Sequence, residues 1–237
     1  MKSIKLFTIF VFTGLLFFSC SAPKQKETTK PQESEKPKIV NIINFIRLLE
    51  PRDREITEDV LYQTVVSQVE MMKQYNLGGT FLLQYDALMD TRYQNLLKDL
   101  PDSTFEIGGW FEIPQPLVEN AGMKWRGRFP WDWHADVGFA TGYTPEEREK
   151  LVDVYMEDFK KIFGYYPKSM GCWFIDAHSL KYMYDKYGIV ASCNCKGQVG
   201  TDGYTMWGGY WNQAYYPSVK NAYMPAQNIE NQIPVPI

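Results

Sequence analysis

Apolar segments as long as buried strands alternate with segments of helical periodicity through the middle of this chain. Five such apolar runs occur, at residues 39–46, 79–84, 104–113, 168–175 and 189–193. Runs of this kind are typical of strands that are covered on both faces. Strands that alternate with helices lie parallel in one sheet. The sequence therefore predicts an α/β fold, either a (β/α) barrel or a doubly wound sheet.

The segments between these runs carry helix signals. The clearest begins at Thr144, which can cap a helix, with Pro145 suited to the first helical position and Glu147 placed to complete a capping box. Gly164 marks the end of that helix. The other predicted helices span residues 58–76, 89–100 and 179–187.

Two long stretches, residues 114–143 and 197–232, lack clear periodicity. Loops of that length inside a compact domain are usually functional or mobile. Residues 233–237, Ile-Pro-Val-Pro-Ile, have the pattern of the beginning of a further strand. Because a closed barrel typically needs about 250 residues, we expect a distorted or incomplete barrel that is truncated at its C-terminus.

Polar and aromatic side chains follow the predicted strands at their carboxyl ends. In parallel α/β folds these ends form one rim, and the working residues lie on it. The rule selects Arg47 and Glu50, Gln84 and Asp86, Trp110 and Glu112, and Trp173 and Asp176. Carboxylates therefore recur at the predicted rim.

Glu112 and Asp176 are the predicted catalytic pair. A glycosidase needs two facing carboxyl groups, one protonated to assist the leaving group and one ionised as base or nucleophile. Glu112 closes an apolar strand next to two prolines and has no evident local structural use; a solvated or ion-paired glutamate is the alternative. Asp176 stands directly before a predicted helix, so an N-cap is the alternative for it.

Aromatic residues form the second functional signal, at 16% of the chain. Trp and Tyr offer flat apolar faces with a polar edge, which suit stacking on sugar rings. The predicted substrate-binding residues are Arg47, Asp86, Trp110, Trp131, Trp133, His134, Trp173, His178, Trp207 and Trp211. Each tryptophan could instead serve core or loop packing, but their concentration near one rim favours a glycan or oligosaccharide ligand.

Metal and cofactor signals are weak. The two histidines, His134 and His178, lack the His-x-x-x-His and Glu-x-x-His spacings of metal sites. Cys172, Cys193 and Cys195 could bind zinc, with free thiols or one disulfide as the alternatives. The sequence has no phosphate-binding glycine loop, no Gly-x-Ser-x-Gly elbow and no dinucleotide fingerprint. We therefore expect neither a metal ion nor another cofactor.

The first 20 residues have the pattern of an export signal. Lys2 and Lys5 form a basic segment, and residues 6–18 are an apolar run too short for a resident transmembrane helix. Residues 16–20, Leu-Phe-Phe-Ser-Cys, resemble the bacterial lipobox, which predicts cleavage before Cys20 and lipidation of its thiol. An ordinary secretory signal and an uncleaved anchor are the alternatives. We therefore expect a lipoprotein of the bacterial cell envelope, at the outer membrane or the periplasmic face.

Residues 21–38 contain no large apolar side chain and are predicted to form a disordered tether below one domain at residues 39–237. Because residues 1–38 carry seven lysines and three glutamates, the formal charge changes from -3 for the whole chain to -7 for that domain. An acidic domain is a poor partner for nucleic acid and for anionic lipid surfaces. Membrane attachment is therefore predicted through lipidated Cys20 alone.

Two segments together resemble the polysaccharide-deacetylase and related glycoside-hydrolase barrels. They are residues 106–112, Glu-Ile-Gly-Gly-Trp-Phe-Glu, and residues 163–176, which contain a Gly-x-x-Pro helix exit before the next strand. The order of elements from Val40 to Cys193 also follows that superfamily, and the similarity is greatest to its bacterial lipoproteins with a domain of unknown function. The resemblance implies a distorted or incomplete TIM barrel of the deacetylase type.

The chain departs from that family pattern at the metal ligands. Trp110, Phe111 and Glu112 stand where the deacetylase histidines would be, and Arg47 and Leu48 stand where an aspartate pair would follow the first strand. Related hydrolases of the superfamily use carboxylates without a metal, which is compatible with the predicted carboxylate pair. We therefore expect a surface-anchored, metal-independent glycoside hydrolase. A non-catalytic glycan-binding lipoprotein and a metal-dependent polysaccharide deacetylase are the alternatives.

Overall fold

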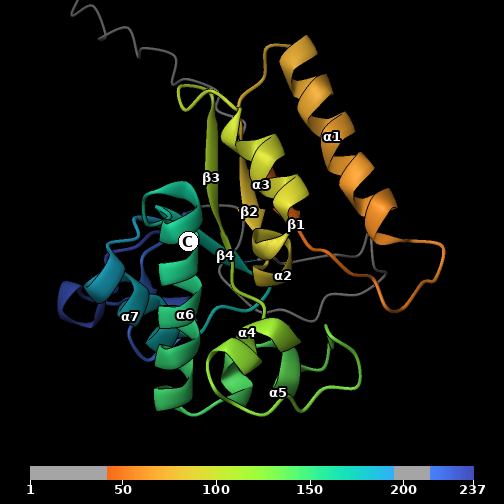
Figure 1. Ribbon diagram of the computed structural model, residues 1–237. Helices are drawn as coiled ribbons and strands as arrows, with labels where there is room; N and C mark the ends of the chain where they lie inside the picture. The colour runs from red at the N-terminus through yellow and green to blue at the C-terminus, as the bar shows by residue number, and fades with distance from the viewer. Residues whose placement is uncertain (1–41, 195–213) are drawn as a thin grey trace, which may run out of the picture. The chain divides into compact units, whose positions relative to one another are not determined.

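Five parallel strands form the central sheet of the computed structural model, which describes residues 42–194 and 214–237. The strands are β1 (Ile43–Ile46), β2 (Gly79–Leu83), β3 (Phe105–Trp110), β4 (Ser169–Cys172) and β5 (Ala191–Asn194) (Figure 1). They follow one another in space in the order of the chain, and each neighbouring pair is parallel. A doubly wound sheet instead reverses its strand order at a switch point. The fold is therefore α/β, with five parallel strands that form an incomplete half-barrel.

The four longest helices contribute buried residues to the core on one face of this sheet. They are α1 (Glu58–Gln74), α3 (Thr91–Lys98), α6 (Pro145–Phe163) and α7 (Ala177–Tyr187) (Figure 1). The helix predicted from Thr144 is confirmed, because Thr144 Oγ1 accepts a hydrogen bond from Glu147 N while Glu147 Oε2 accepts one from Thr144 N. Its last residue is followed by Gly164 at φ +86°, a left-handed conformation that favours glycine.

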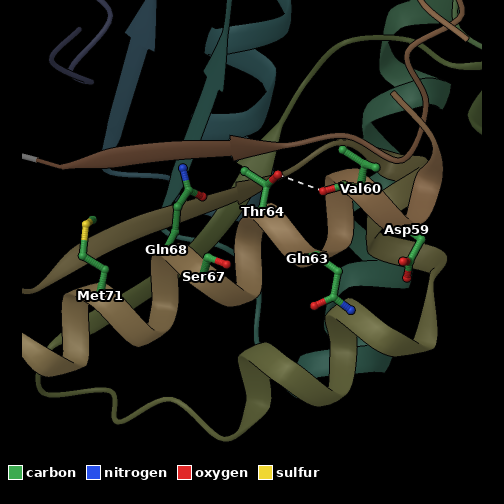
Figure 2. A pocket seen from close by; sticks show the side chains of 7 residues that line it. All are labelled: Asp59, Val60, Gln63, Thr64, Ser67, Gln68 and Met71. Carbon is green, nitrogen blue, oxygen red and sulfur yellow. Dashed lines mark hydrogen bonds between the residues drawn. The ribbon is translucent and has the colours of Figure 1, made fainter. Parts of the chain in front are cut away.

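A surface hollow of about 530 Å³ runs along the exposed side of α1. Figure 2 shows the side chains that line it, which are Asp59, Val60, Gln63, Thr64, Ser67, Gln68 and Met71. Thr64 Oγ1 donates a hydrogen bond to Val60 O at 2.8 Å, so this hydroxyl is used by the helix itself. None of the predicted site residues lines the hollow.

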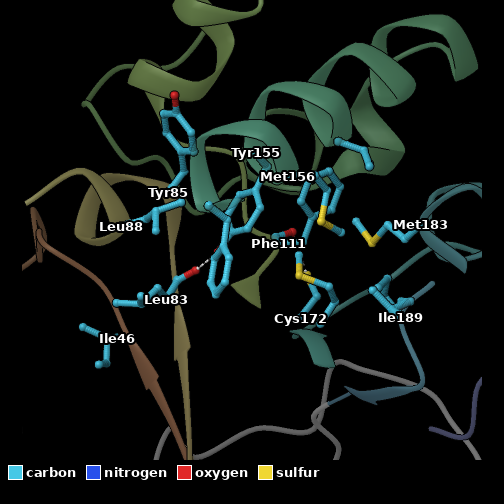
Figure 3. Close-up of a cluster of buried hydrophobic side chains, with 14 of the residues drawn as sticks. Ile46, Leu83, Tyr85, Leu88, Phe111, Tyr155, Met156, Cys172, Met183 and Ile189 are labelled. Carbon is cyan, nitrogen blue, oxygen red and sulfur yellow. Dashed lines mark hydrogen bonds between the residues drawn. The ribbon is translucent and has the colours of Figure 1, made fainter. Parts of the chain in front are cut away.

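The core lies between the strands and the helices. Figure 3 shows its centre, where Leu83 of β2 and Cys172 of β4 face Tyr155 and Met156 of α6. Tyr155 Oη donates a hydrogen bond to Leu83 O at 2.5 Å, which satisfies the one polar group of this buried ring. Full burial of an apolar side chain contributes about 1.5–3 kcal/mol, so this face of the sheet supplies most of the stabilisation.

The opposite face of the sheet carries a different set of residues. Paired residues of parallel strands point to the same side, and the register pairs Phe45 with Leu82 and Trp110 with Gly171. A Cβ atom at Gly171 would lie 2.8 Å from Trp110 Cε3 and 2.7 Å from Leu82 Cδ1, so glycine is required for the indole to cross this strand. Leu82 and Trp110 are buried, but they lie outside the helix-side core. This inner face leads to the candidate site at its carboxyl end.

Two predicted segments between β2 and α6 differ from the structure. The helix expected at residues 89–100 corresponds to α3, whereas α2 (Tyr85–Met89) before it was not predicted. Asp90 separates the two helices and caps α3 by accepting a hydrogen bond from Arg92 N at 2.7 Å. The stretch at residues 114–143 contains α4 (Gln115–Asn120), α5 (Ala135–Gly138) and the 3-10 turn η1 (Ala140–Gly142). These elements are too short to produce a periodic signal.

The C-terminal part also differs. Residues 197–232 were expected to be irregular. Their described part contains an antiparallel pair, β6 (Pro217–Ser218) and β7 (Asn221–Pro225), and then the 3-10 turn η2 (Ile229–Asn231). Residues 233–237, expected to begin a strand, are not a strand of the sheet, although Pro236 O accepts a hydrogen bond from Ser192 N of β5 at 2.9 Å. Proline has no N–H to donate, which prevents a regular ladder here.

Several predicted features lie outside the described residues. These are the export signal with Cys20, the tether, Cys195, Trp207 and Trp211. Among the helices that the structure does describe, none combines the length and the apolar character needed to span a bilayer.

Candidate functional site

Glu112 lies two residues beyond β3, at the carboxyl end of the sheet. Only 2% of the surface of Glu112 is exposed. Gln84, directly after β2, donates a hydrogen bond from Nε2 to Glu112 Oε2 over 3.2 Å and is itself fully buried. The carboxyl group of Glu112 therefore faces a neutral amide in the interior of the rim.

Burial has the largest effect on the pKa of Glu112 and raises it to about 8. The indole of Trp110 and the charge of Arg47 lower this pKa, whereas Asp86 raises it. A carboxyl group with such a pKa is mostly protonated at neutral pH. Glu112 can therefore donate a proton where an ordinary glutamate could not.

Asp86 is the second buried carboxyl group at this rim. It lies in the first turn of α2, and its Oδ1 accepts a hydrogen bond from Ala87 N at 2.7 Å. Burial raises its pKa to about 7, against the effects of neighbouring backbone N–H groups and of Arg47. The charge of Arg47 acts on both Asp86 and Glu112. The structure therefore brings together three predicted residues from the ends of three strands.

Arg47 and Arg52 share the carboxylate of Glu50. Arg47 forms an ion pair with Glu50. Arg52 binds the same group through both carboxylate oxygens, with Nη2 at 2.6 Å from Oε2 and Nε at 2.7 Å from Oε1. Burial lowers the pKa of Arg47, and Glu50 opposes that effect. The sequence placed Glu50 at the rim but missed Arg52, because a residue in an irregular loop after β1 carries no periodic signal.

Phe45, Trp110 and Trp173 form an aromatic cluster on the inner face. The rings of Phe45 and Trp110 are stacked with centroids 4.8 Å apart, and Trp173 meets them edge-on at 5.0 and 5.4 Å. Trp110 is buried, while Phe45 and Trp173 are half-buried. The two tryptophans were predicted. Phe45 was missed, because an aromatic residue inside a strand is more often part of the core.

A second aromatic group leads from Arg47 to the surface. Arg47 Cζ lies 4.8 Å from the ring centre of Trp131, which is buried. Trp133 is 36% exposed and lies 6.1 Å from Trp131. It stacks on Phe129 at 5.7 Å and on His134 at 6.1 Å. The predicted residues of this loop are therefore continuous with the rim.

Asp132 holds this second group in place. It accepts hydrogen bonds from Arg128 Nε at 2.9 Å and Nη2 at 3.0 Å, and its Oδ1 lies 2.9 Å from His134 Nδ1. The hydrogen bonds from Arg128 hold the pKa of Asp132 well below its usual range, which keeps the buried group ionised. The sequence analysis missed Asp132 and Arg128; their spacing of four residues around Trp131 was the available signal.

Asp176 has a different environment. Its Oδ1 accepts a hydrogen bond from Ser179 N at 3.0 Å and pairs with Arg148 Nη1 of α6 at 3.0 Å. The N-cap alternative for Asp176 is therefore confirmed. Its Oδ2 has no hydrogen-bonding partner among the described residues. The charges of Arg47 and Asp86 are among the main influences on the pKa of Glu112, and that of Asp176 is not.

A metal-dependent deacetylase needs a cluster of side chains that can hold its metal ion. Within residues 42–194 and 214–237, no three His, Cys, Asp or Glu side chains lie close enough together to hold a metal ion. His178 pairs with Glu149 at 3.1 Å on the surface. Burial raises the pKa of the Cys193 thiol to about 11. The described residues do not fit the metal of that family, and no step is derived through it.

Two solved structures are similar to this one. The first, from Parabacteroides distasonis, is provisionally described as a glycoside hydrolase/deacetylase; it has 16% sequence identity and a TM-score of 0.50 over 82% of this chain and 43% of its own. The second is provisionally described as a polysaccharide deacetylase from Mycobacterium smegmatis, with 12% identity and a TM-score of 0.39 over 65% of this chain and 41% of its own. No protein-family model and no curated protein matches the sequence. The chain thus spans less than half of the similar structures, and the likeness to the first shows that it shares the fold of that protein.

Proposed function

We propose that this protein is carbohydrate-active and cleaves glycosidic bonds at the rim that holds Arg47, Asp86 and Glu112. The observation that carries the proposal is Glu112, a buried carboxyl group with a pKa of about 8 next to aromatic rings. A carboxylic acid that is protonated at neutral pH is the general acid that a glycosidase needs. The rings of Phe45 and Trp173 offer apolar faces for a sugar.

Glu112 is the acid in this mechanism. Its proton passes to the glycosidic oxygen while the bond from that oxygen to the anomeric carbon breaks, so the leaving group departs as an alcohol. The carboxylate that remains accepts the hydrogen bond from Gln84 Nε2 and is stabilised by the charge of Arg47. General acid catalysis of this kind contributes about 10²–10⁴-fold to the rate.

Asp86 is the partner of Glu112. Against the effect of burial, backbone N–H groups of Ala87 and Leu48 lower the pKa of Asp86, and an aspartate is ordinarily the stronger acid, so Asp86 is assigned as the ionised member of the pair. As a carboxylate it takes the proton of the water that attacks the anomeric carbon, which balances the proton given by Glu112. Asp86 takes the place that the sequence analysis assigned to Asp176, because Arg148 and Ser179 occupy Asp176 Oδ1.

Release of reducing ends from a panel of polysaccharides tests the proposal. We expect Glu112→Gln to lower the rate at least about 100-fold on a substrate that the wild type cleaves, because the amide cannot donate an acidic proton. Glu106→Gln is the matched control, since Glu106 lies on the same strand but is exposed. It should keep wild-type turnover. Full activity in Glu112→Gln would contradict the proposal.

A glycan-binding protein without catalysis is the second candidate. The exposed indole of Trp133, which stacks with Phe129 and with His134, favours it, because flat aromatic faces of this kind can bind sugars without any catalysis. This candidate replaces the first if the wild type binds an oligosaccharide, cleaves none of the panel, and loses no affinity in Glu112→Gln. For the deacetylase alternative, the diagnostic result is acetate release that a chelator abolishes.

We also propose that lipidated Cys20 anchors the protein in the bacterial cell envelope. The support is the local sequence of the first 20 residues. Cys20→Ala should abolish incorporation of a labelled fatty acid and release the protein from the membrane fraction. Unchanged membrane association of Cys20→Ala would favour an uncleaved anchor.

A further inference from the structure

We infer that Gln84 is a positioning residue for Glu112: its side-chain N–H holds Oε2 of the Glu112 carboxyl group, so that Oε1 carries the proton that is transferred to the substrate. The inference rests on the proposed function, because it concerns the acid of the same site. It assigns the orientation of that acid to a second residue, which acts through Glu112.

The contact between the two side chains joins the ends of neighbouring strands. Gln84 follows β2 directly, and Glu112 lies two residues beyond β3. Gln84 Nε2 donates a hydrogen bond to Glu112 Oε2 over 3.2 Å, and both residues are buried, with 0% and 2% of their surfaces exposed. Water does not compete for a hydrogen bond between buried groups, so the amide restricts the orientation of the carboxyl group.

The backbone around Gln84 is fixed by three other elements of the fold. The N–H of Gln84 donates to Ile46 O at the end of β1 over 2.8 Å, and its C=O accepts from Leu88 N of α2 at 2.8 Å. The peptide group before it is held as well, because Tyr155 Oη of α6 donates to Leu83 O at 2.5 Å. A side chain on such a backbone has little freedom and can hold a neighbouring group in one orientation.

Stability alone does not account for an amide at residue 84. Gln84 Oε1 is buried and has no hydrogen-bonding partner among the residues that the structure describes. A buried polar atom without a partner costs free energy, and an apolar side chain of similar size would avoid that cost. The hydrogen bond to Glu112 is therefore the contact that accounts for the amide.

The direction of this hydrogen bond determines which oxygen of Glu112 carries the proton. In a carboxylic acid the carbonyl oxygen is the stronger acceptor, and the proton is on the other oxygen. Because Gln84 Nε2 donates to Oε2, the proton of the neutral acid lies on Oε1. Transfer breaks the O–H bond at Oε1, forms an O–H bond on the glycosidic oxygen and leaves the electron pair on the carboxylate, which the same N–H stabilises.

The opposite orientation of the amide would have the opposite effect. With its Oε1 toward Glu112, Gln84 would accept the acid proton and keep it from the substrate. A donor favours the ionised carboxylate and lowers its pKa, whereas an acceptor favours the neutral acid and raises it. The direction in which the pKa of Glu112 changes when the amide is removed therefore distinguishes the two orientations.

A variant that removes the amide has to keep the other influences on Glu112. Burial raises its pKa most, and smaller effects come from Trp110, Arg47, Asp86 and Arg52. Gln84→Met changes none of these groups. Methionine is unbranched, apolar and adaptable in shape, so it fills the space of the glutamine and keeps water out.

The pKa of Glu112 in Gln84→Met tests the inference without any substrate. Carbon-13 NMR of the glutamate carboxyl groups measures it, and the signal that is lost in Glu112→Gln identifies the residue. We expect Gln84→Met to raise this pKa by about 0.5–1 pH unit, because the carboxylate loses a donor. Gln94→Met is the matched control, since Gln94 is half-buried and its Nε2 donates to Leu88 O at 2.9 Å. It should leave the pKa unchanged.

Rates are the second measurement, on a glycan that the wild type cleaves. The alkaline limb of the pH profile of kcat/KM reports the protonated acid, so in Gln84→Met it should move to higher pH by the same amount. Loss of orientation should lower kcat about 10-fold and leave KM within about 2-fold, because only the acid is displaced. Gln94→Met should keep the profile and the rate of the wild type. A purely structural role of Gln84 would leave the limb in place.

The side-chain amide of Gln84 keeps the inference testable if Gln84→Met does not fold. In the wild type, the nitrogen-15 and proton signals of Nε2 should titrate with the pKa of Glu112, about 8, because this N–H binds the group that ionises. The amide signals of Gln94 should not follow that pKa, and in Glu112→Gln those of Gln84 should no longer do so.

The outcomes separate this inference from the proposed function. A lower or unchanged pKa of Glu112 in Gln84→Met, or an amide signal of Gln84 that does not titrate, overturns the inference. The proposed function still holds in that case if the wild type cleaves a glycan and Glu112→Gln does not. A raised pKa in a protein that cleaves no glycan supports the orientation of Glu112 by Gln84 and contradicts the glycosidase proposal alone.

Discussion

The ends of β3 and β4 each lead to a carboxyl group that the sequence marks as catalytic, yet the two regions use it differently. After β4, Asp176 caps α7 through Ser179 N and pairs with Arg148 of α6. After β3, Glu112 is buried beside the neutral amide of Gln84. A carboxylate that a helix and an arginine both hold has a structural use. A buried carboxyl group without those partners keeps its proton and can transfer it.

The difference arises from the segment that comes after each strand. A helix begins directly after Asp176, so its oxygen lies where the first N–H groups of α7 need an acceptor. After β3 the next helix, α4, begins after Pro114, and no side chain caps it. The chain there leaves Glu112 facing the interior of the rim. Position at the rim therefore selects candidates, and the neighbours decide which of them is available for chemistry.

The largest expected effect is on turnover, and it distinguishes Asp86 from Asp176 as the catalytic partner of Glu112. Asp86→Asn should lower turnover about 100-fold or more, because the proposed base is lost. Asp176→Asn should remain within about 5-fold of the wild type, since asparagine also caps helices. Initial rates of reducing-end release measure both. An inactive Asp176→Asn with an unchanged circular dichroism spectrum would reverse the comparison and restore the pair expected from the sequence.

The next effect concerns stability. Asp176→Ala should lower the free energy of unfolding by about 3 kcal/mol, because it removes a cap and leaves Arg148 without its partner. Glu112→Gln should instead raise it by about 1–3 kcal/mol at neutral pH, because Glu112 must take up a proton on folding there and an amide need not. Urea unfolding measures both values. Asp59→Ala, in the exposed first turn of α1, is the control and should cost about 0.5 kcal/mol. A neutral Asp176→Ala would show that the cap and ion pair contribute little.

A smaller effect is the dependence of stability on pH. The pKa of Glu112 is about 8 in the folded protein and 4.5 ordinarily, so the folded state binds this proton more tightly. The resulting stabilisation is complete below about pH 4.5 and is lost as the pH rises toward 8. Burial also raises the pKa of Asp86, from its ordinary value of 3.8 to about 7. Over that pH range Asp86 therefore makes the free energy of unfolding fall with rising pH, as Glu112 does.

These two shifts together predict that the free energy of unfolding falls by about 6 kcal/mol between about pH 5 and pH 8, with the larger part from Glu112. Glu112→Gln should remove part of this fall, whereas Asp176→Asn should keep all of it. The measurement is urea unfolding at a series of pH values. An identical slope in the wild type and in Glu112→Gln would mean that Glu112 does not carry the shifted pKa.

The smallest effect is expected at His178, on the Asp176 side of the comparison. His178 pairs with Glu149 at 3.1 Å on the surface, and exposed pairs of this kind contribute less than about 1 kcal/mol. His178→Ala should therefore unfold nearly as the wild type does and keep its turnover and glycan affinity. A clear loss of glycan binding would place His178 in the substrate site, as the sequence analysis expected.

Local signals predicted the elements of the fold well where they depend on neighbouring residues. The helix α6 follows from Thr144, Pro145 and Glu147, which act within one turn. The helix α2 was missed because five residues are too short for a periodic signal. The pair β6 and β7 was missed because strands of two and five residues are too short for a clear alternation.

The sequence predicted where the candidate site lies better than it predicted which of its carboxyl groups is available for catalysis. Arg47, Asp86 and Glu112 could be expected at one rim, because the carboxyl ends of parallel strands lie on the same edge. The cap formed by Asp176 was one of two alternatives from the sequence, but its ion pair with Arg148 could not be predicted, since Arg148 lies 28 residues away on another helix. The proton on Glu112 could not either, because burial by residues from several elements raises its pKa.

By itself the sequence determined the alternation of strands and helices, the main helix caps and the residues that occupy the strand ends. These depend on periodicity and on hydrogen bonds between residues a few positions apart. The tertiary structure alone decided that the strands lie in sequential order as a half-barrel, that Asp86 accompanies Glu112, and that exposed arginines cover buried acids at the rim. Those outcomes depend on burial and charge summed over residues that are distant in the chain, and the free energy of a proton or an ion pair follows from that sum.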